Sequence, residues 1–348
     1  MDSSDGTGWT VVLRLRPGAY RYRYYANPNN RDLNQPGLFT YRRLQDEVFY
    51  RVDQLMRLEK PPAISNVRLK ELVEARVTYG QKLPFECRYS YYRLGEDDYL
   101  VPISARVANR DLEYETGAAD IRFAKVNLVC RVAGMDGRIA AEFDDNLYSQ
   151  YGPLEFPEKD RHFSLYQKIL RLRPGRYKAS VVLQTADGRK TGSSEFAIQL
   201  PPKSQTTEMN LSPIVLSEYI SRILGSPSQL SPFVIGDVRV VPSFERKFGG
   251  RDEVGVYAQA YDFQVDASTG KPSLKVRFEV ATDQGSVLRE FDDDGGRSYQ
   301  MYGANRLVIS KKVPLLDLPA GRYELRVYVR DEIAGREKKA IERFTVGG

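Results

Sequence analysis

The sequence predicts a mainly β protein, with two tandem immunoglobulin-like β-sandwiches that follow a short N-terminal strand and helix segment. Three observations indicate this fold. Short strand-like segments bounded by turn residues recur along the chain, the order of the segments repeats, and one motif occurs three times. The motif reads LRLRPGAYRYRYY at 13–25, LRLRPGRYKASVVL at 170–183 and LDLPAGRYELRVYV at 316–329. Several short strands at regular spacing are typical of sandwiches.

The chain contains an internal duplication. Residues 101–199 and 254–346 align with differences in length only in the loops, and AEFDDN at 141–146 matches REFDDD at 289–294. A chain of 348 residues is also too long for one ordinary core. The predicted boundaries are therefore an N-terminal strand, loop and helix at 1–62, taken as the remnant of a preceding unit, a first sandwich at 63–202 and a second at 203–348.

The repeated motif resembles a tyrosine corner. A Pro-Gly or Pro-Ala-Gly bend is followed one residue later by a tyrosine, at the start of a penultimate strand. We expect Tyr177 and Tyr323 to be mostly buried, each with its hydroxyl bonded to backbone a few residues upstream. Glycine at 175 and 321 would supply the positive φ of a tight bend. This makes the motif architectural rather than functional.

The N-terminal copy leads into a strand in which Tyr20, Tyr22 and Tyr24 alternate with two arginines. Period-2 alternation predicts one aromatic and one basic face. Such a strand could stack bases and hold phosphates, but docking on a sheet of its own first sandwich or of a neighbouring subunit is the preferred interpretation. An orphan strand of this kind would otherwise expose backbone donors and apolar rings.

A helix is predicted at 41–58, and strands dominate the rest of the chain. Leu44, Val48, Val52, Leu55 and Met56 recur at helical spacing, and two prolines at 61 and 62 follow. PFECRYSYYRL and YLVPISARV flank the turn GEDD at 95–98, which predicts a hairpin. IVLSEYISRIL at 214–224 is open to either a strand or a helix. The inward-facing residues predicted for later strands are Val101, Ile103, Ala105 and Val107; Val126, Leu128, Cys130 and Val132; Ala179, Val181 and Leu183; Val276, Phe278 and Val280; and Leu325, Val327 and Val329.

The sequence predicts no catalytic, cofactor-binding or metal-binding residues. The single histidine, His162, cannot by itself supply a histidine metal site or triad, and Cys87 and Cys130 stand too far apart for a C-x-x-C motif. Both cysteines are expected in the first core, either as free thiols or as one disulfide. Acidic pairs at Asp144–Asp145 and Asp292–Asp294 could bind Ca²⁺, but solvated turns are the preferred interpretation and no metal is expected there.

Charge and hydropathy narrow the class of partner. The formal net charge is +6, but acidic and basic residues are interspersed, so no nucleic acid is expected. No apolar stretch of 18 residues is present, so no membrane span is expected. The start, MDSSDGTGW, lacks the regions of a signal peptide, although a cytoplasmic location does not follow from that.

Several segments, in order, resemble the C-terminal β-sandwich half of bacterial, mainly acidobacterial, GWxTD domain-containing proteins. They are KLPFECRYSYYRLGEDDYLVPISARVANRDL, VNLVCRV, YQKILRLRPGRYKASVVL and FVIGDVRVVPSF with VGVYAQAYDF, and the similarity covers roughly residues 45–348. The naming motif is absent, because Gly8-Trp9-Thr10 is followed by Val11. The resemblance transfers no activity and no site residue, and it implies export.

These observations together predict a non-enzymatic structural or protein-interaction protein of the bacterial cell envelope or an extracellular assembly. Its expected partners are proteins, with self-association through the N-terminal strand, and its expected location is periplasmic or extracellular. The alternative is a carbohydrate- or ligand-binding β-sandwich module that uses exposed tyrosines.

Overall fold

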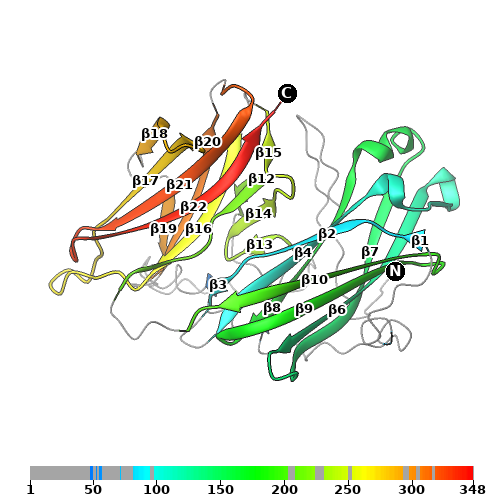
Figure 1. The fold of residues 1–348 in the computed structure, drawn as a ribbon, viewed down its shortest axis with the longest axis horizontal. Helices are drawn as coiled ribbons and strands as arrows, with labels where there is room; N and C mark the ends of the chain where they lie inside the picture. The colour runs from blue at the N-terminus through cyan, green and yellow to red at the C-terminus, as the bar shows by residue number, and fades with distance from the viewer. Residues whose placement is uncertain are drawn as a thin grey trace, which may run out of the picture.

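The computed structural model describes residues 48, 49, 52, 55, 56, 71, 81–94, 98–202, 208–223, 231–249, 253–292, 298–302, 306–315 and 318–347. Its strands form two sandwiches that lie side by side, one drawn in cyan and green and the other in yellow to red (Figure 1). The tyrosine-rich strand predicted at 13–25, most of the GEDD turn, and Asp293 and Asp294 lie outside the described residues. The predicted helix at 41–58 is confirmed at its described positions, since Val48, Phe49, Val52, Leu55 and Met56 are helical.

The first sandwich packs two sheets against each other. One has the strand order β1-β10-β9-β6, with β5 and β7 also paired to β6, and the other has β4 at its centre between β8 and the pair β2 and β3. Short 3₁₀ turns at Asn109–Asp111, Ala118–Asp120 and Phe156–Arg161 connect the strands. The strands are β1 (Gln81–Lys82), β2 (Phe85–Tyr89), β3 (Tyr92–Arg93), β4 (Tyr99–Ala108), β5 (Glu115–Thr116), β6 (Arg122–Gly134), β7 (Ile139–Tyr151), β8 (Phe163–Leu172), β9 (Gly175–Thr185) and β10 (Lys190–Leu200).

The second sandwich repeats this plan. One sheet has the order β15-β22-β21-β17-β18, and the other has the order β13-β14-β12-β16-β20-β19, with β11 also paired to β16. Its strands are β11 (Asn210–Leu211), β12 (Val215–Arg222), β13 (Val234–Ile235), β14 (Val238–Pro242), β15 (Lys247–Phe248), β16 (Glu253–Tyr261), β17 (Leu274–Thr282), β18 (Val287–Asp292), β19 (Tyr299–Tyr302), β20 (Arg306–Pro314), β21 (Gly321–Asp331) and β22 (Arg336–Val346).

The topology bears out the duplication read from the sequence. The run β6-β9-β10 of the first sandwich corresponds to β17-β21-β22 of the second, with β7 and β18 paired at equivalent outer positions. The central strands β4 and β16 correspond in the opposing sheets. The ambiguous segment at 214–224 forms strand β12, where pairing with both β14 and β16 suits its β-branched residues better than a helix would.

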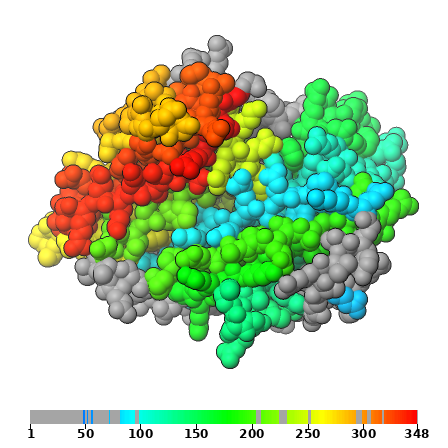
Figure 2. Space-filling view, in the orientation of Figure 1, coloured from blue at the N-terminus to red at the C-terminus, as the bar shows by residue number. Residues whose placement is uncertain are grey.

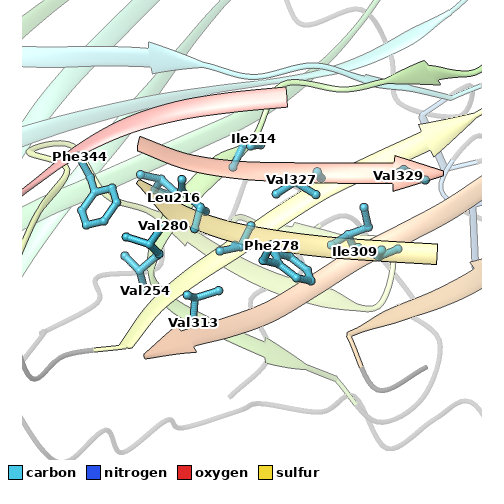
Figure 3. Packing of buried hydrophobic residues seen from close by; sticks show 14 of the residues in the cluster. Ile214, Leu216, Val254, Phe278, Val280, Ile309, Val313, Val327, Val329 and Phe344 are labelled. Carbon is cyan, nitrogen blue, oxygen red and sulfur yellow. The ribbon is translucent and has the colours of Figure 1, made fainter. Parts of the chain in front are cut away.

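Each sandwich encloses its own apolar core. All of the inward-facing residues predicted from strand periodicity belong to one of these two clusters. Figure 3 shows the core of the second sandwich, where Phe278 and Val327 of one sheet approach Ile309 and Leu216 of the other. Burial of this kind contributes roughly 25 cal/mol per Å² of apolar surface, so the two cores are the main source of stability.

The tyrosine corners are present, with one difference from the prediction. The hydroxyls of Tyr177 and Tyr323 donate to the carbonyls of Arg173 and Pro319, at 2.8 and 2.7 Å. Tyr323 is only 5% exposed, as predicted, but Tyr177 is half-buried, which corrects the expectation for the first copy. The ring of Phe344 lies 5.6 Å from that of Tyr323, whereas the smaller Ile198 faces Tyr177 in the equivalent register.

The expected role of the corner glycines also needs correction at one of the two positions. Gly175 has a φ of +154°, but Gly321 does not have a positive φ. In both copies the ring of the tyrosine two residues later folds back over the glycine, and a Cβ there would lie 3.4 Å from the ring, which is an ordinary van der Waals contact. Space therefore does not require glycine at either position, and only the positive φ at Gly175 favours it.

Removing only the tyrosine hydroxyl should lower stability by different amounts at the two corners. We expect Tyr323→Phe to lower the free energy of unfolding by about 1 kcal/mol, because the hydroxyl of the buried Tyr323 loses a partly buried hydrogen bond to the Pro319 carbonyl. Tyr177→Phe should cost less, because the hydrogen bond from Tyr177 to the Arg173 carbonyl is exposed and water can replace it. Urea denaturation of the two variants measures the difference, and a larger loss for Tyr177→Phe would contradict this account.

Candidate functional site

The two sandwiches are joined face to face through a third apolar cluster. The central strands β4 and β16 of the two facing sheets are buried on both faces, by apolar and some polar side chains. The described helical residues pack into the same cluster. Its members are Val48, Phe49, Val52 and Met56 from the helix; Tyr92, Leu100 and Ile169 with Leu94 from the first sandwich; and Ile220, Ile235, Val238, Val240, Tyr257, Tyr302 and Val308 from the second.

Aromatic side chains form the centre of this interface. Tyr92 and Tyr257 are fully buried and meet edge to face, with ring centroids 5.1 Å apart. Phe49 meets Tyr302 in the same way at 5.2 Å, and its ring lies against Gly236, whose φ of +66° and missing Cβ admit it. Aromatic pairs of this geometry add to the stability given by area burial.

Polar groups fix the relative orientation of the two sandwiches. The Arg93 guanidinium makes two hydrogen bonds to the carboxylate of Asp262, at 2.5 and 2.7 Å. In the opposite direction, Arg306 Nη2 donates to the carbonyls of Arg93 and Leu94, at 2.7 and 3.0 Å. Gln167 Oε1 accepts the backbone N–H of Phe233 at 2.7 Å. Directional hydrogen bonds across an apolar interface predict one defined arrangement of the two sandwiches, rather than two domains that move independently on a flexible linker.

A cavity of about 320 Å³ remains between the sandwiches. Strands β2, β4 and β8 line it from the first sandwich, and β12, β14 and β22 line it from the second. In the space-filling view the cyan surface around β2 runs directly into the yellow-green surface around β12 and β14 (Figure 2). Ligand sites occur preferentially at such domain boundaries, which makes the cavity the leading candidate for a functional site.

Three charged side chains line the cavity, Arg88, Arg246 and Glu342. The carboxylate of Glu86 also acts on the Arg88 guanidinium. Arg246 pairs with Glu342, and Arg88 Nη2 donates to the Phe244 carbonyl. Burial, followed by the charge of Arg246, lowers the pKa of Arg88, and burial raises the pKa of Glu342 despite its arginine partner. Both directions indicate charges held partly out of water.

Two polar atoms beside the cavity are fully buried, the hydroxyl of Tyr92 and Nε of Arg88. The Tyr92 hydroxyl has the Ser90 side chain as a hydrogen-bond partner, and Arg88 Nε has none among the described residues. Burial raises the pKa of Tyr92, and the neighbouring side chain of Ser90 opposes that rise. Both atoms are enclosed by protein and have almost no accessible surface, so neither marks a ligand position in the cavity.

The residues singled out from the sequence lie elsewhere. Asp145 accepts hydrogen bonds from the Tyr166 hydroxyl at 3.0 Å and from the Asn146 N–H at 2.8 Å, and Asp292 ends β18. The Nδ1 atom of His162 lies 3.3 Å from the Tyr151 hydroxyl, and the two rings stack. In the described part of the chain, no group of three or more His, Cys, Asp or Glu residues is arranged to hold a metal ion. Of the cavity residues, sequence reasoning singled out Cys87, as a core cysteine, but it did not identify the charged residues of the lining.

Both cysteines are free thiols in the first sandwich. Cys130 is fully buried and Cys87 lines the cavity. Burial raises the pKa of Cys87 to about 12 and raises that of Cys130 as well. The open choice between thiols and a disulfide is therefore answered in favour of thiols.

These pKa shifts predict slow alkylation of the native protein. At pH 8 the thiolate fraction of Cys87 should be on the order of 10⁻⁴, and the thiolate is the reactive form. We expect iodoacetamide to label neither cysteine at pH 8 within minutes, and to label both in 8 M urea. Mass spectrometry measures the labelling, and rapid modification of native Cys87 would contradict the assignment.

Comparisons with known proteins find only weak likenesses to solved structures. No protein-family model and no curated protein matches the chain. A biofilm-associated protein BSP domain is 9% identical at a TM-score of 0.20, covering 80% of this chain and 54% of that one, so this chain spans about half its length. Fibronectin(III)-like modules of Clostridium thermocellum CbhA are 13% identical at 0.18, covering 72% and 86% of the two chains. A β-glucuronidase 2 mutant of Bacteroides uniformis is 9% identical at 0.27, covering 70% and 26%.

The fold class, two tandem immunoglobulin-like β-sandwiches, rests on the strand pairing of the chain itself. None of the described helical segments is long and apolar enough to cross a membrane.

Proposed function

We propose that the chain is a non-enzymatic structural or protein-interaction protein of the bacterial cell envelope or an extracellular assembly. The observation that carries this proposal is the fusion of two sandwiches into one body through the apolar third cluster and its directional hydrogen bonds. A rigid double sandwich suits a load-bearing or spacing element. The proposed location rests on the resemblance to GWxTD domain-containing proteins, which implies export.

The outer edges of the two sandwiches favour association with other chains. Among the described strands, β7 pairs only with β6, and β18 pairs only with β17. Both edge strands carry exposed apolar side chains. These are Ile139 and Tyr148 on β7, and Val287 and Leu288 on β18. An unpaired edge presents backbone donors and acceptors that an added strand can satisfy.

The strand expected at 13–25 is the proposed partner for such an edge. Its three alternating tyrosines would pack on a sheet, and its arginines would meet acceptor carboxylates or water. Docking within the same chain gives a monomer, and docking on a neighbouring subunit gives a polymer by strand addition.

Deleting residues 1–35 and measuring mass by light scattering tests this function. Loss of a large species on deletion supports self-association through the strand. A monomer that stays monomeric but becomes less stable supports docking in the same chain. A monomer of unchanged size and stability after deletion would overturn the proposed role of the segment.

The ligand-binding alternative is favoured by a different observation, the cavity between the sandwiches. A structural role and a small-molecule site are compatible, since the cavity lies inside the body and the edge strands lie outside it.

A further inference from the structure

We propose that residues 65–79 form an amphipathic helix that docks on the outer face of the sheet made by β10, β9, β6 and β7 in the first sandwich. Two observations support this interaction surface and its occupant. They are a buried apolar strip on the outer face of the sheet and the residue pattern of the segment that leads into β1. The inference does not depend on the proposed structural function.

Two valines on the outer face of this sheet are buried. Val129 of β6 and Val182 of β9 are direct cross-strand partners, and they point away from the first core because their neighbours Cys130 and Val181 belong to it. They are 0% and 3% exposed, yet they belong to none of the described apolar clusters. The described core packing therefore does not account for their burial, and another segment of the chain covers them.

The duplicated sheet of the second sandwich shows that the fold does not require an apolar outer face. Arg277 and Tyr328 occupy the positions equivalent to the two valines and are also direct cross-strand partners. The Arg277 guanidinium lies over the Tyr328 ring at 4.2 Å, and the Tyr328 hydroxyl donates to Glu279 Oε2 at 2.9 Å. Where the second sandwich has this polar, partly exposed pair, the first has a pair that favours burial.

The low exposure follows a diagonal strip across the outer face. It begins at Thr191 of β10 and Gln184 of β9, which are 2% and 7% exposed, and it continues over the two valines. It ends at the ion pair of Arg131 and Glu142, whose side chains are only 16% and 18% exposed. Ser193 of β10 lies beside the strip on the same face and is exposed. A strip of this shape indicates a rod-like cover rather than a cover over the whole face.

The chain enters the sheet at one end of this strip. Strand β1 pairs with β10 through Gln81 with Lys190 and Lys82 with Thr191, so the residues before Gln81 approach the face where the strip begins. A helix of residues 65–79 would be about 22 Å long. The four strands from β10 to β7 span about 14 Å, so such a helix is long enough to follow the strip.

The sequence of the segment fits this role. SNVRLKELVEARVTYG at 65–80 places Leu69, Leu72, Val73 and Val77 on one side of a helix, and the final glycine suits a helix C-terminus. Glu71 falls on the opposite side, and this described residue is helical and exposed. The apolar side would cover the two valines, while the charged side would face water.

The other candidate occupant is the strand expected at 13–25. It precedes the helix that packs between the sandwiches, and no described strand pairing brings it to the start of the strip. With residues 65–79 docked, the first sandwich presents its edges to partners, whereas the outer face of the second sandwich stays open.

Hydrogen exchange of the full chain, measured by mass spectrometry, tests the proposal. We expect the amides of residues 65–79 to exchange at least about 100-fold more slowly than in an unstructured chain. Val182→Lys puts a charge under the helix, so it should lower this protection at least about tenfold while β21 and β22 keep theirs. The matched control is Ser193→Lys, directly across from Val182 and exposed, which should change nothing.

Absence of protection at 65–79 in the unmodified chain would overturn the proposal without any variant. Protection that survives Val182→Lys would overturn it too, as would loss of protection at 13–25 in place of 65–79, which would assign the face to the N-terminal strand.

Alkylation gives a second readout if Val182→Lys fails to fold. The thiol of Val182→Cys should resist iodoacetamide in the otherwise unchanged chain and should react once Leu72→Lys is added. Glu71→Lys is the control on the exposed side of the segment and should leave the thiol protected. Rapid reaction of Val182→Cys without a second substitution would show an open face and contradict the proposal.

Discussion

Replacing Tyr257 with alanine is expected to lower the free energy of unfolding by about 3–5 kcal/mol, the range for large aromatic side chains removed from a core. Tyr257 is fully buried between the sandwiches, packs edge to face on Tyr92, and accepts a hydrogen bond from Gln259 Nε2 at 2.6 Å. The loss should appear in urea denaturation. It should also be accompanied by faster proteolysis between the sandwiches, because the variant weakens their joint rather than either core.

The control for this variant is Tyr148→Ala on strand β7. Tyr148 is 42% exposed and belongs to none of the apolar clusters, so its loss should cost about 1 kcal/mol or less. Equal destabilisation by the two substitutions would show that the third cluster does not hold the sandwiches together.

Arg306→Met is expected to destabilise the protein by about 3 kcal/mol. Arg306 is buried, its Nη2 donates to two carbonyls of the first sandwich, and its guanidinium lies over the Phe49 ring at 4.0 Å. Methionine preserves much of the apolar stem but leaves both carbonyls without their charged donor, and each such bond contributes roughly 1.5–3 kcal/mol.

The measurement is again the free energy of unfolding from urea denaturation, with Arg189→Met as the control. The Arg189 side chain is 75% exposed and its ion pairs are at the surface, so its replacement should stay within about 0.5 kcal/mol. A loss below 1 kcal/mol for Arg306→Met would mean that water reaches these carbonyls.

Much of the fold could be predicted from the sequence because one face of most strands is buried. The alternation at Val276, Phe278 and Val280 places three residues in the second core, and the repeated Gly-x-Tyr motif marks equivalent corners. Local patterns of this kind depend only on strand geometry, so they can be read without knowing which strands pair.

The interface was missed for the opposite reason. Strands β4 and β16 are buried on both faces. On the outer faces, Leu100 and Tyr257 pack in the cluster between the sandwiches, against residues more than 100 positions away in the sequence. Periodicity identifies the core face of each strand but does not show what covers the other face. The continuous burial of YLVPISARV, which contains few charges, was the available signal.

The candidate site was equally inaccessible to sequence reasoning. Arg88, Tyr92, Arg246 and Glu342 come from separate strands and a loop of two sandwiches, and they form no local motif. The difference between Tyr177 and Tyr323 also depends on a residue across the sheet, since Ile198 and Phe344 occupy the facing positions. Such features follow from pairing and docking, which a single sequence does not display.

The central claim is that the two sandwiches form one rigid body. Residual dipolar couplings of backbone amides, measured on deuterated protein for β6, β9 and β10 and for β17, β21 and β22, test it most directly. The account predicts that couplings from both sandwiches fit a single alignment tensor with the relative orientation seen here. Two tensors that differ in magnitude would show independent motion of the sandwiches and would contradict the account.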